Sequence, residues 1–345
     1  MTLLFDRHRL IVSPTLAPTQ QHEADENDLP QNPADAVLTI GLINNMPDSA
    51  LQATERQFTD LLRAAAGDHR IHLHCFSLPS VKRSEPAKSR VDRHYTDIAD
   101  LGRLPIDGLI VTGAEPNAKT LPEEPFWRDL TAIVDWAEAN TRSTIWSCLA
   151  AHAAVLHLDG IERQRLDAKC SGVFDCAKVI DSWLTAEVPS PLKISHSRFN
   201  ALRKRDLVAR DYLVLTESRQ AGVDIFARQR NSLFVFFQGH PEYDALSLQR
   251  EYLRDITRFI AGERDTYPAV PAGYFDAATE HRLASFQMQA TAERRLPLST
   301  ALPPLTLRPD IAAGAAATAI FRNWLEYLAL GAAAKVPPAG RGGLR

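Results

Sequence analysis

The chain has 345 residues, of which 45% are hydrophobic and 23% charged, and its formal net charge at pH 7 is -3. This length supports one large domain or two medium ones, and the composition is typical of a globular protein in solution. The only clustered basic run, "RFNALRKRD" (198–206), fits a solvated loop better than a nucleic-acid interface. We therefore expect no nucleic-acid partner.

The number of cysteines and the hydropathy of the chain indicate in which cellular compartment we expect the protein. No apolar run approaches the roughly 18 residues that cross a bilayer, and the N-terminus lacks a secretory pattern. The four cysteines (Cys75, Cys148, Cys170 and Cys176) are too few for a disulfide framework, and they do not form a paired CxxC zinc site. We expect a cytoplasmic protein with reduced thiols, no metal and no membrane contact.

In chain order, the first segment is polar and Pro-rich without periodicity, which predicts a poorly ordered N-terminal arm over 1–35. The apolar run at 36–46 is typical of a strand covered on both faces. The stretch from Pro47 has the apolar spacing of a helix and is expected to end near Gly67.

Strands and helices then alternate. We expect strands at 71–78, 107–116 and 143–148, an exposed polar loop at 81–95, and a helix over 124–140. Further strands are expected in "YLVLTES", "VDIFARQ" and "SLFVFFQGHPEYD", and helices over 246–263 and in "TAIFRNWLEYLALGAAA". The Pro- and Ala-rich segment 264–310 is expected to be less regular and appended to one domain over 36–335, followed by a flexible tail over 336–345.

This alternation predicts an α/β fold with a mostly parallel, doubly wound sheet flanked by helices. In such sheets, ligands bind beyond the carboxyl ends of the strands. Four expected strand ends carry unusual residues: "NNMPDS", "VTGAEP", "WSCLAAH" and "FQGHPEYD". A site is therefore expected where these ends meet.

Cys148 lies between a predicted strand and a predicted helix, as the nucleophile does in a nucleophile elbow. The helix N-terminus favours a thiolate, and the backbone N–H of Leu149 can serve a developing oxyanion. Ser147 and Ala150 are small enough for a crowded turn. A buried, unreactive thiol is equally compatible with this stretch alone.

His240 follows a strand rich in Phe and Val, and Pro241 restricts it to extended geometry. Glu242 is within reach of the imidazole, where it would fix the tautomer and support the imidazolium. A structural loop histidine is the alternative interpretation. His152, four residues after Cys148, is a competing base, although we expect it to pack under the elbow or line the pocket.

At these residues the sequence resembles the homoserine O-acyltransferases of the succinyltransferase type. These share the class I glutamine amidotransferase-like fold, a flavodoxin-like three-layer architecture. The similarity runs from residue 36 to the C-terminal "FRNWLEYL". The pieces that carry it, in order, are "GLINNMPDSALQATERQF", "DGLIVTGAEP" with "PFW", "SCLAAHAAVLHLDGI", "KCSGVF", "HSRF" and "GHPEYDALSLQREYLRD".

The resemblance implies a ping-pong acyl transfer that serves methionine biosynthesis. Cys148 would take a succinyl or acetyl group from acyl-CoA as a thioester, and the hydroxyl of L-homoserine would then attack it. His240 would act as the general base with Glu242 as its partner. No bound cofactor is expected, acyl-CoA is a co-substrate, and a homodimer is expected.

The resemblance also implies a binding site for the amino-acid acceptor at Lys169, Ser197 and Arg254. Arg254 can pair bidentately with an α-carboxylate, while Glu251 or Ser197 can serve the ammonium or hydroxyl end. The turn around Gly113 is expected to supply a second oxyanion donor beside that of Leu149.

The sequence departs from the family pattern at three places. Asp48 and Ser49 stand where the family has "MPKK". "TGAEP" replaces "TGAP", and a loop position that tracks acyl choice in the family (Gly for succinyl, Glu for acetyl) is Asn117. His152 replaces a glutamine. A divergent acyltransferase with another amino-acid or amine acceptor, a glutamine amidotransferase-like hydrolase and a binding protein therefore remain alternatives.

Overall fold

The computed structural model describes residues 4–6, 9–12, 37–114, 116, 118–293, 302–309 and 314–334. The chain divides into two compact units, each built from separate stretches of sequence. Unit 1 comprises Met1–Trp146, Arg228–Val235 and Thr318–Arg345, and unit 2 comprises Ser147–Ala227 and Phe236–Ala317.

Unit 1 contains most of the predicted strand–helix alternation. Its elements are β1 (Leu4–Asp6), β2 (Arg9–Val12), β3 (Val37–Ile43), α1 (Asp48–Ala65), β4 (Arg70–Phe76), α2 (Glu85–His94), η2 (Ile98–Arg103), β5 (Gly108–Val111), η3 (Leu121–Glu123), α3 (Trp127–Asn140), β6 (Ser143–Ser147) up to Trp146, the first residues of β13 (Leu233–Phe237), and most of α9 (Ala315–Ala334).

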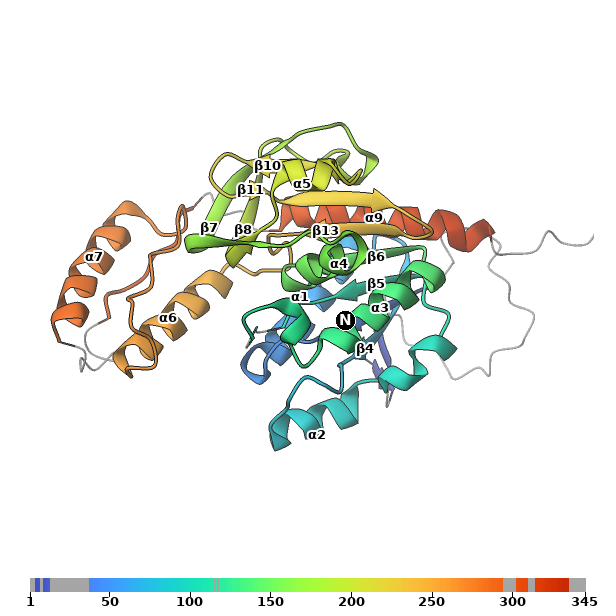
Figure 1. The fold of residues 1–345 in the computed structure, drawn as a ribbon, viewed down its shortest axis with the longest axis horizontal. Helices are drawn as coiled ribbons and strands as arrows, with labels where there is room; N and C mark the ends of the chain where they lie inside the picture. The colour runs from blue at the N-terminus through green and yellow to red at the C-terminus, as the bar shows by residue number, and fades with distance from the viewer. Residues whose placement is uncertain are drawn as a thin grey trace, which may run out of the picture. The chain divides into compact units, whose positions relative to one another are not determined.

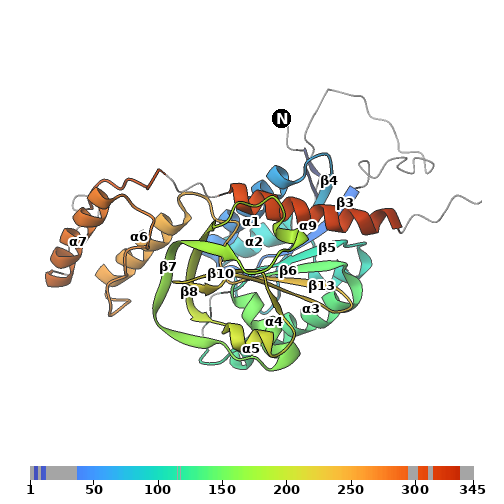
Figure 2. The same cartoon turned by 90° about the horizontal axis from the view of Figure 1, so that it is seen from above.

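The centre of unit 1 is a parallel sheet in the order β4-β3-β5-β6. β2 continues it antiparallel to β4, and β1 pairs antiparallel with β2. Every residue of β5 and β6 is buried, which requires helices on both faces. Figure 2 shows α9 and α3 on opposite sides of β5 and β6. The predicted parallel, helix-flanked α/β sheet is therefore confirmed.

Large aromatic side chains fix α9 on its face of this sheet. Phe321 of α9 packs against Phe58 of α1, with ring centroids 6.4 Å apart. Trp324 Nε1 donates a hydrogen bond to Ser143 Oγ at 2.9 Å, and both residues are fully buried. Gly108 of β5 provides the space for these rings, because a Cβ there would lie 2.8 Å from the Trp324 ring and 2.5 Å from Leu328.

Unit 2 contains a second, antiparallel sheet that the sequence did not predict. Its elements are α4 (Leu149–Asp159), β7 (Gln164–Lys178), η4 (Trp183–Thr185), β8 (Leu192–Ala201), α5 (Lys204–Val208), β9 (Leu213–Val214), β10 (Thr216–Ser218), β11 (Gly222–Val223), β12 (Ile225–Gln229) up to Ala227, the end of β13, α6 (Ser247–Ile260), α7 (Ala277–Ala292) and the first residues of α9. The strands of this sheet follow the order β11-β10-β7-β8.

Two helices of unit 2, α6 and α7, lie side by side (Figure 1). Leu248, Tyr252 and Ile256 of α6 form a buried cluster with residues that include Leu283 and Phe286 of α7. These α6 residues recur every four positions, so one face of the helix is apolar. The opposite side of α6 is free to carry charged residues.

The structure differs from the sequence-based predictions in two segments. The predicted loop at 81–95 contains α2, whose ten residues include none that is buried, so it has no apolar stripe to reveal it. The less regular segment 264–310 contains the 16-residue α7, where Asp276 Oδ1 accepts a hydrogen bond from Thr279 N at 2.7 Å as an N-cap.

The domain boundaries stay a prediction. β1 and β2 lie within the predicted N-terminal arm, and the rest of that arm falls outside the described residues, as does the tail over 336–345. None of the helices in the described part of the chain combines the length and apolar character needed to cross a membrane.

The contact between Gly108 and α9 gives a packing test. Replacing Gly108 with Ala inserts a methyl group against Trp324 and Leu328, and it should lower the free energy of unfolding by about 1–3 kcal/mol. Gly102→Ala is the matched control, because its new Cβ meets only Trp136 at an ordinary 3.7 Å. Urea denaturation measures both variants, and equal midpoints for the two would contradict the packing described here.

Candidate active site

Cys148 lies at a strained turn between β6 and α4. Its φ is 52° and its ψ -111°, a conformation that non-glycine residues rarely adopt. The Cys148 N–H donates to the carbonyl oxygen of Phe237 at 2.7 Å, which holds the turn against the end of β13. The turn thus has the backbone of a nucleophile elbow, with a half-buried thiol.

The helix after the turn is buried and made of small residues at its start. Leu149 is its first residue, so the Leu149 N–H has no acceptor within the helix. Ala150 and Ala151 are fully buried, which allows the helix to approach its neighbours closely. The oxyanion role of the Leu149 N–H stays a prediction.

His240 follows the end of β13, and its backbone is fixed at two points. Its own N–H donates to Ser195 O at 2.7 Å, and the preceding Gly239 N–H donates to Asp224 Oδ1 at 3.2 Å. Only 8% of His240 is exposed. A side chain at position 239 would collide, since a Cβ there lies 2.7 Å from Asp224 Oδ1.

The imidazole of His240 lies between the two partners that the sequence predicted. Its Nδ1 is 2.9 Å from Glu242 Oε1, and the His240 side chain also hydrogen-bonds with Cys148. Burial lowers the pKa of His240, but the charges and hydrogen bonds of Glu242 and Cys148 outweigh it and leave that pKa well above its usual value. The structure therefore brings Cys148, His240 and Glu242 together as a triad.

The predicted acceptor-binding residues also form one group. Lys169 comes from β7, Ser197 from β8, and Glu251 and Arg254 from α6. Glu251 Oε2 accepts hydrogen bonds from Ser197 Oγ and from Lys169 Nζ, the latter at 3.3 Å. Glu251 thus joins three elements of unit 2 at one carboxylate.

Asp255, which the sequence did not single out, completes this group. Its carboxylate lies 3.1 Å from Lys169 Nζ, 3.0 Å from Arg254 Nη2 and 3.3 Å from Arg264 Nη1. Its position four residues after Glu251 puts both carboxylates on one face of α6, and this spacing could have revealed it.

The electrostatics of the group leave both carboxylates ionised. Burial raises the pKa of Glu251, but Lys169, Ser197 and Tyr243 bring it below the usual value. Burial likewise raises the pKa of Asp255, and Lys169 and Arg254 lower it further than burial raises it. Three cations (Lys169, Arg254 and Arg264) thus lie beside these two carboxylates, and the planar guanidinium of Arg254 has the geometry that pairs with a carboxylate.

Two further residues, Gly113 and Asn117, were predicted from the sequence to belong to the site. Gly113 is buried in unit 1 directly after β5, where its carbonyl oxygen accepts a hydrogen bond from Thr112 Oγ1 at 3.0 Å. Asn117 falls outside the described residues. The oxyanion role of Gly113 and the acyl-pocket role of Asn117 stay predictions.

His152 is a buried hydrogen-bond donor below the elbow. Its Nε2 is 3.1 Å from Gln238 Oε1, which also accepts from the Leu202 N–H at 2.8 Å. Because Gln238 Oε1 is an acceptor, His152 Nε2 carries the proton. Burial lowers the pKa of His152 to about 3. This neutral, buried histidine supports the turn before His240, as the packing interpretation expected.

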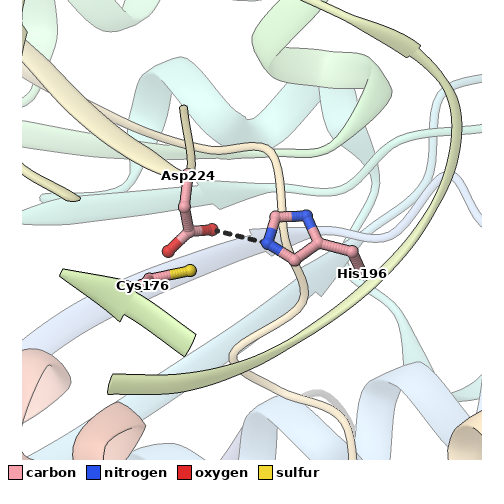
Figure 3. A group of neighbouring side chains, drawn as sticks. All are labelled: Cys176, His196 and Asp224. Atoms are coloured by element: carbon pink, nitrogen blue, oxygen red, sulfur yellow. Dashed lines mark ion pairs between the residues drawn. The ribbon is translucent and has the colours of Figure 1, made fainter. Parts of the chain in front are cut away.

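One group of side chains in the described residues has the composition of a metal site. Cys176, His196 and Asp224 are fully buried, and one ligand atom of each lies within 4.8 Å of the others (Figure 3). His196 Nε2, the nitrogen that faces this group, is 3.5 Å from Asp224 Oδ1.

The hydrogen bonds around His196 oppose metal binding. Arg198 Nε donates to His196 Nδ1 at 3.3 Å, and a guanidinium can only donate. Burial and the charge of Arg198 lower the pKa of His196 well below its usual value, so the ring is neutral. Its single proton is therefore on Nε2, where a metal would have to bind. Asp224 instead supports the backbone before His240, because its Oδ1 accepts from the Gly239 N–H.

Solved structures with a similar fold include glutamine amidotransferases. One from Thermotoga maritima has a TM-score of 0.46 and 14% identity, and the match covers 85% of this chain and 98% of that chain. One from Methylobacillus flagellatus has a TM-score of 0.44 and 12% identity, over 84% and 94% of the two chains.

Curated relatives are much more similar. A homoserine O-succinyltransferase of Bradyrhizobium japonicum is 60% identical over 96% of this chain and 100% of its own length. Another, of Rhodopseudomonas palustris, is 59% identical over 95% of this chain and 99% of its own length. The family model described as homoserine O-succinyltransferase matches residues 11–334. This chain therefore belongs to the homoserine O-succinyltransferase family.

Proposed function

We propose that this chain transfers a succinyl group from succinyl-CoA to the hydroxyl of L-homoserine through a thioester on Cys148, a step of methionine biosynthesis. The observation that carries the proposal is the His240 imidazole held between Glu242 Oε1 and the Cys148 side chain. The charged group around Glu251 and the similarity to homoserine O-succinyltransferases support the choice of substrates. A homodimer in the cytoplasm stays an expectation.

In the first half-reaction, the Cys148 sulfur attacks the thioester carbonyl of succinyl-CoA. The carbonyl oxygen becomes an oxyanion, which the Leu149 N–H stabilises. The bond between the carbonyl carbon and the CoA sulfur then breaks, and the imidazolium of His240 gives its proton to the departing CoA thiolate. The products are free CoA and a succinyl thioester on Cys148.

In the second half-reaction, the hydroxyl of homoserine attacks this thioester. Neutral His240 takes the hydroxyl proton as the carbon–oxygen bond forms, and the Cys148 thiolate leaves. The Glu242 carboxylate holds Nδ1 and stabilises the imidazolium that results. The acceptor lies with its α-carboxylate toward Arg254 and its ammonium toward Glu251, since these are the charges that complement it.

The covalent step gives the most direct test. Intact-protein mass spectrometry after mixing with succinyl-CoA, without acceptor, should show the mass of one succinyl group added. Cys148→Ala should show none, because the nucleophile is gone. Cys75→Ala is the control and should keep the adduct, since Cys75 lies in β4, outside the proposed site. An adduct of unchanged yield on Cys148→Ala would refute the assignment.

A second test uses the pKa of His240. Glu242 raises this pKa, so replacing Glu242 with Gln should lower it and make the neutral base available at lower pH. The rate of transfer from acyl-enzyme to homoserine should then begin to rise at lower pH than in the wild type, with a plateau reduced by about 10²–10⁴-fold. Stopped-flow rates across pH measure both effects. Glu263→Gln, at an exposed position, is the control and should leave the profile unchanged.

A third test concerns the acceptor. Arg254→Lys keeps the charge but loses the planar fork, so the KM for homoserine should rise about tenfold while acylation by succinyl-CoA is unchanged. Arg250→Lys is the matched control, because Arg250 lies on the same helix but pairs with the exposed Asp244 at 2.7 Å. Steady-state kinetics with each substrate varied separate the two. A rise in the KM for succinyl-CoA alone would place Arg254 at the donor instead.

A further inference from the structure

Tyr243 contacts the catalytic histidine through its ring. The rings of Tyr243 and His240 stack with centroids 4.2 Å apart and an interplanar angle of 20°. The Tyr243 N–H also donates to the His240 carbonyl oxygen at 3.3 Å, which closes a turn around Pro241 and Glu242. The phenol ring therefore covers one face of the imidazole.

The hydroxyl of the same side chain reaches the carboxylate at the centre of the acceptor group. Tyr243 Oη donates to Glu251 Oε1 at 2.5 Å, while Glu251 Oε2 accepts from Ser197 and Lys169. Burial and the charges of Glu251 and Glu242 raise the pKa of Tyr243 well above its usual value, so the phenol keeps its proton. The Tyr243 hydroxyl is thus a fixed donor to Glu251.

These contacts matter most after Cys148 has been acylated. In the free enzyme, His240 is held by Glu242 on Nδ1 and by the side chain of Cys148. A thioester on Cys148 has no charge and no proton to share, so the second contact is lost. The ring is then held by Glu242 and by the stack with Tyr243, and Glu251 fixes the orientation of that stack.

We propose that Tyr243 is a positioning residue that connects His240 to Glu251 and orients the imidazole for transfer of the acyl group to the amino-acid hydroxyl. The inference rests on the proposed function, because it assigns a different contact to each half-reaction. It also gives each oxygen of Glu251 a role: Oε1 accepts from Tyr243, and Oε2 accepts from Ser197 and Lys169.

Tyr243→Phe tests this role, because it keeps the ring and removes the bond to Glu251. In single-turnover measurements, acylation by succinyl-CoA should stay within about twofold of wild type, while transfer to homoserine falls about tenfold, as expected for losing a hydrogen bond to a charged group. The KM for homoserine should stay within about twofold, since Lys169 and Arg254 are unchanged. Tyr212→Phe, which removes a hydroxyl bonded to Asp159 Oδ2 at 2.6 Å, should change neither step.

A double-mutant cycle shows whether Tyr243 acts through Glu251. If it does, Tyr243→Phe should cost little in the transfer rate once Glu251→Gln is present, because the two side chains form one connection. The proposal would be overturned if the rate losses of the two single variants multiply in the double variant. It would also be overturned if Tyr243→Phe slows both half-reactions equally, or if its transfer rate equals that of the wild type.

Different results would overturn the proposed acyl transfer and the role of Tyr243. Wild-type enzyme that forms no succinyl adduct would overturn the proposed function and the role of Tyr243 together. An adduct that forms and transfers normally in both wild type and Tyr243→Phe would overturn the role of Tyr243 alone. Thermal denaturation of each variant, with a midpoint near that of the wild type, excludes loss of folding as the cause of a slow transfer.

Discussion

The hydrogen bond from the Cys148 N–H to the Phe237 carbonyl determines the geometry of the site. At 2.7 Å it holds a non-glycine residue at a φ of 52°, a conformation that costs about 1–3 kcal/mol. The buried packing of α4 offsets this cost, since Ala150 and Ala151 have no exposed surface. Because Phe237 is followed within three residues by His240, the bond that fixes the proposed nucleophile also constrains the position of the proposed base.

The backbone beside His240, the proposed base, is held by a buried polar network. Asp224 accepts from the Gly239 N–H through Oδ1 and from Thr216 Oγ1 through Oδ2, and both contacts are buried. Burial raises the pKa of Asp224 to about 6, because removing a charged carboxylate from water costs free energy. Arg198 lies nearby with its guanidinium bonded to His196 and to two backbone carbonyl oxygens. The buried carboxylate of Asp224 thus holds the backbone directly before His240.

The sequence revealed those parts of the protein that depend on local patterns. Continuous apolar runs marked the parallel strands of unit 1, because their side chains are buried on both faces. Helix α2 was not predicted because no side chain in it is buried, so the sequence has no apolar helical stripe there. The second sheet was not predicted because the first half of β7 contains no buried residue, so it shows no clear apolar alternation. The register of β7 with β8 also shifts between Arg165 and Cys170.

Only some residues of the candidate site could be predicted from the sequence. Cys148, His240 and Glu242 stand at strand ends, where function is expected in an α/β sheet. Tyr243 stands in the same strand end as His240, and Asp255 lies four residues after Glu251, but neither position shows which side chains the residue contacts in the fold. Tyr243 meets Glu251 only because the turn after His240 faces α6, and Asp255 gains meaning only beside Lys169 and Arg264.

The arrangement of charges around His240 suggests how one imidazole can serve as acid and then as base. Glu242 and Cys148 together raise its pKa, which suits the proton that must be given to CoA. In the proposed reaction, acylation removes the contribution of Cys148 and lowers the pKa of His240, so the ring can accept the hydroxyl proton of the acceptor. The acceptor ammonium then offsets the charge of Glu251, which acts in the same direction. Each step of the reaction thus prepares the protonation state that the next step requires.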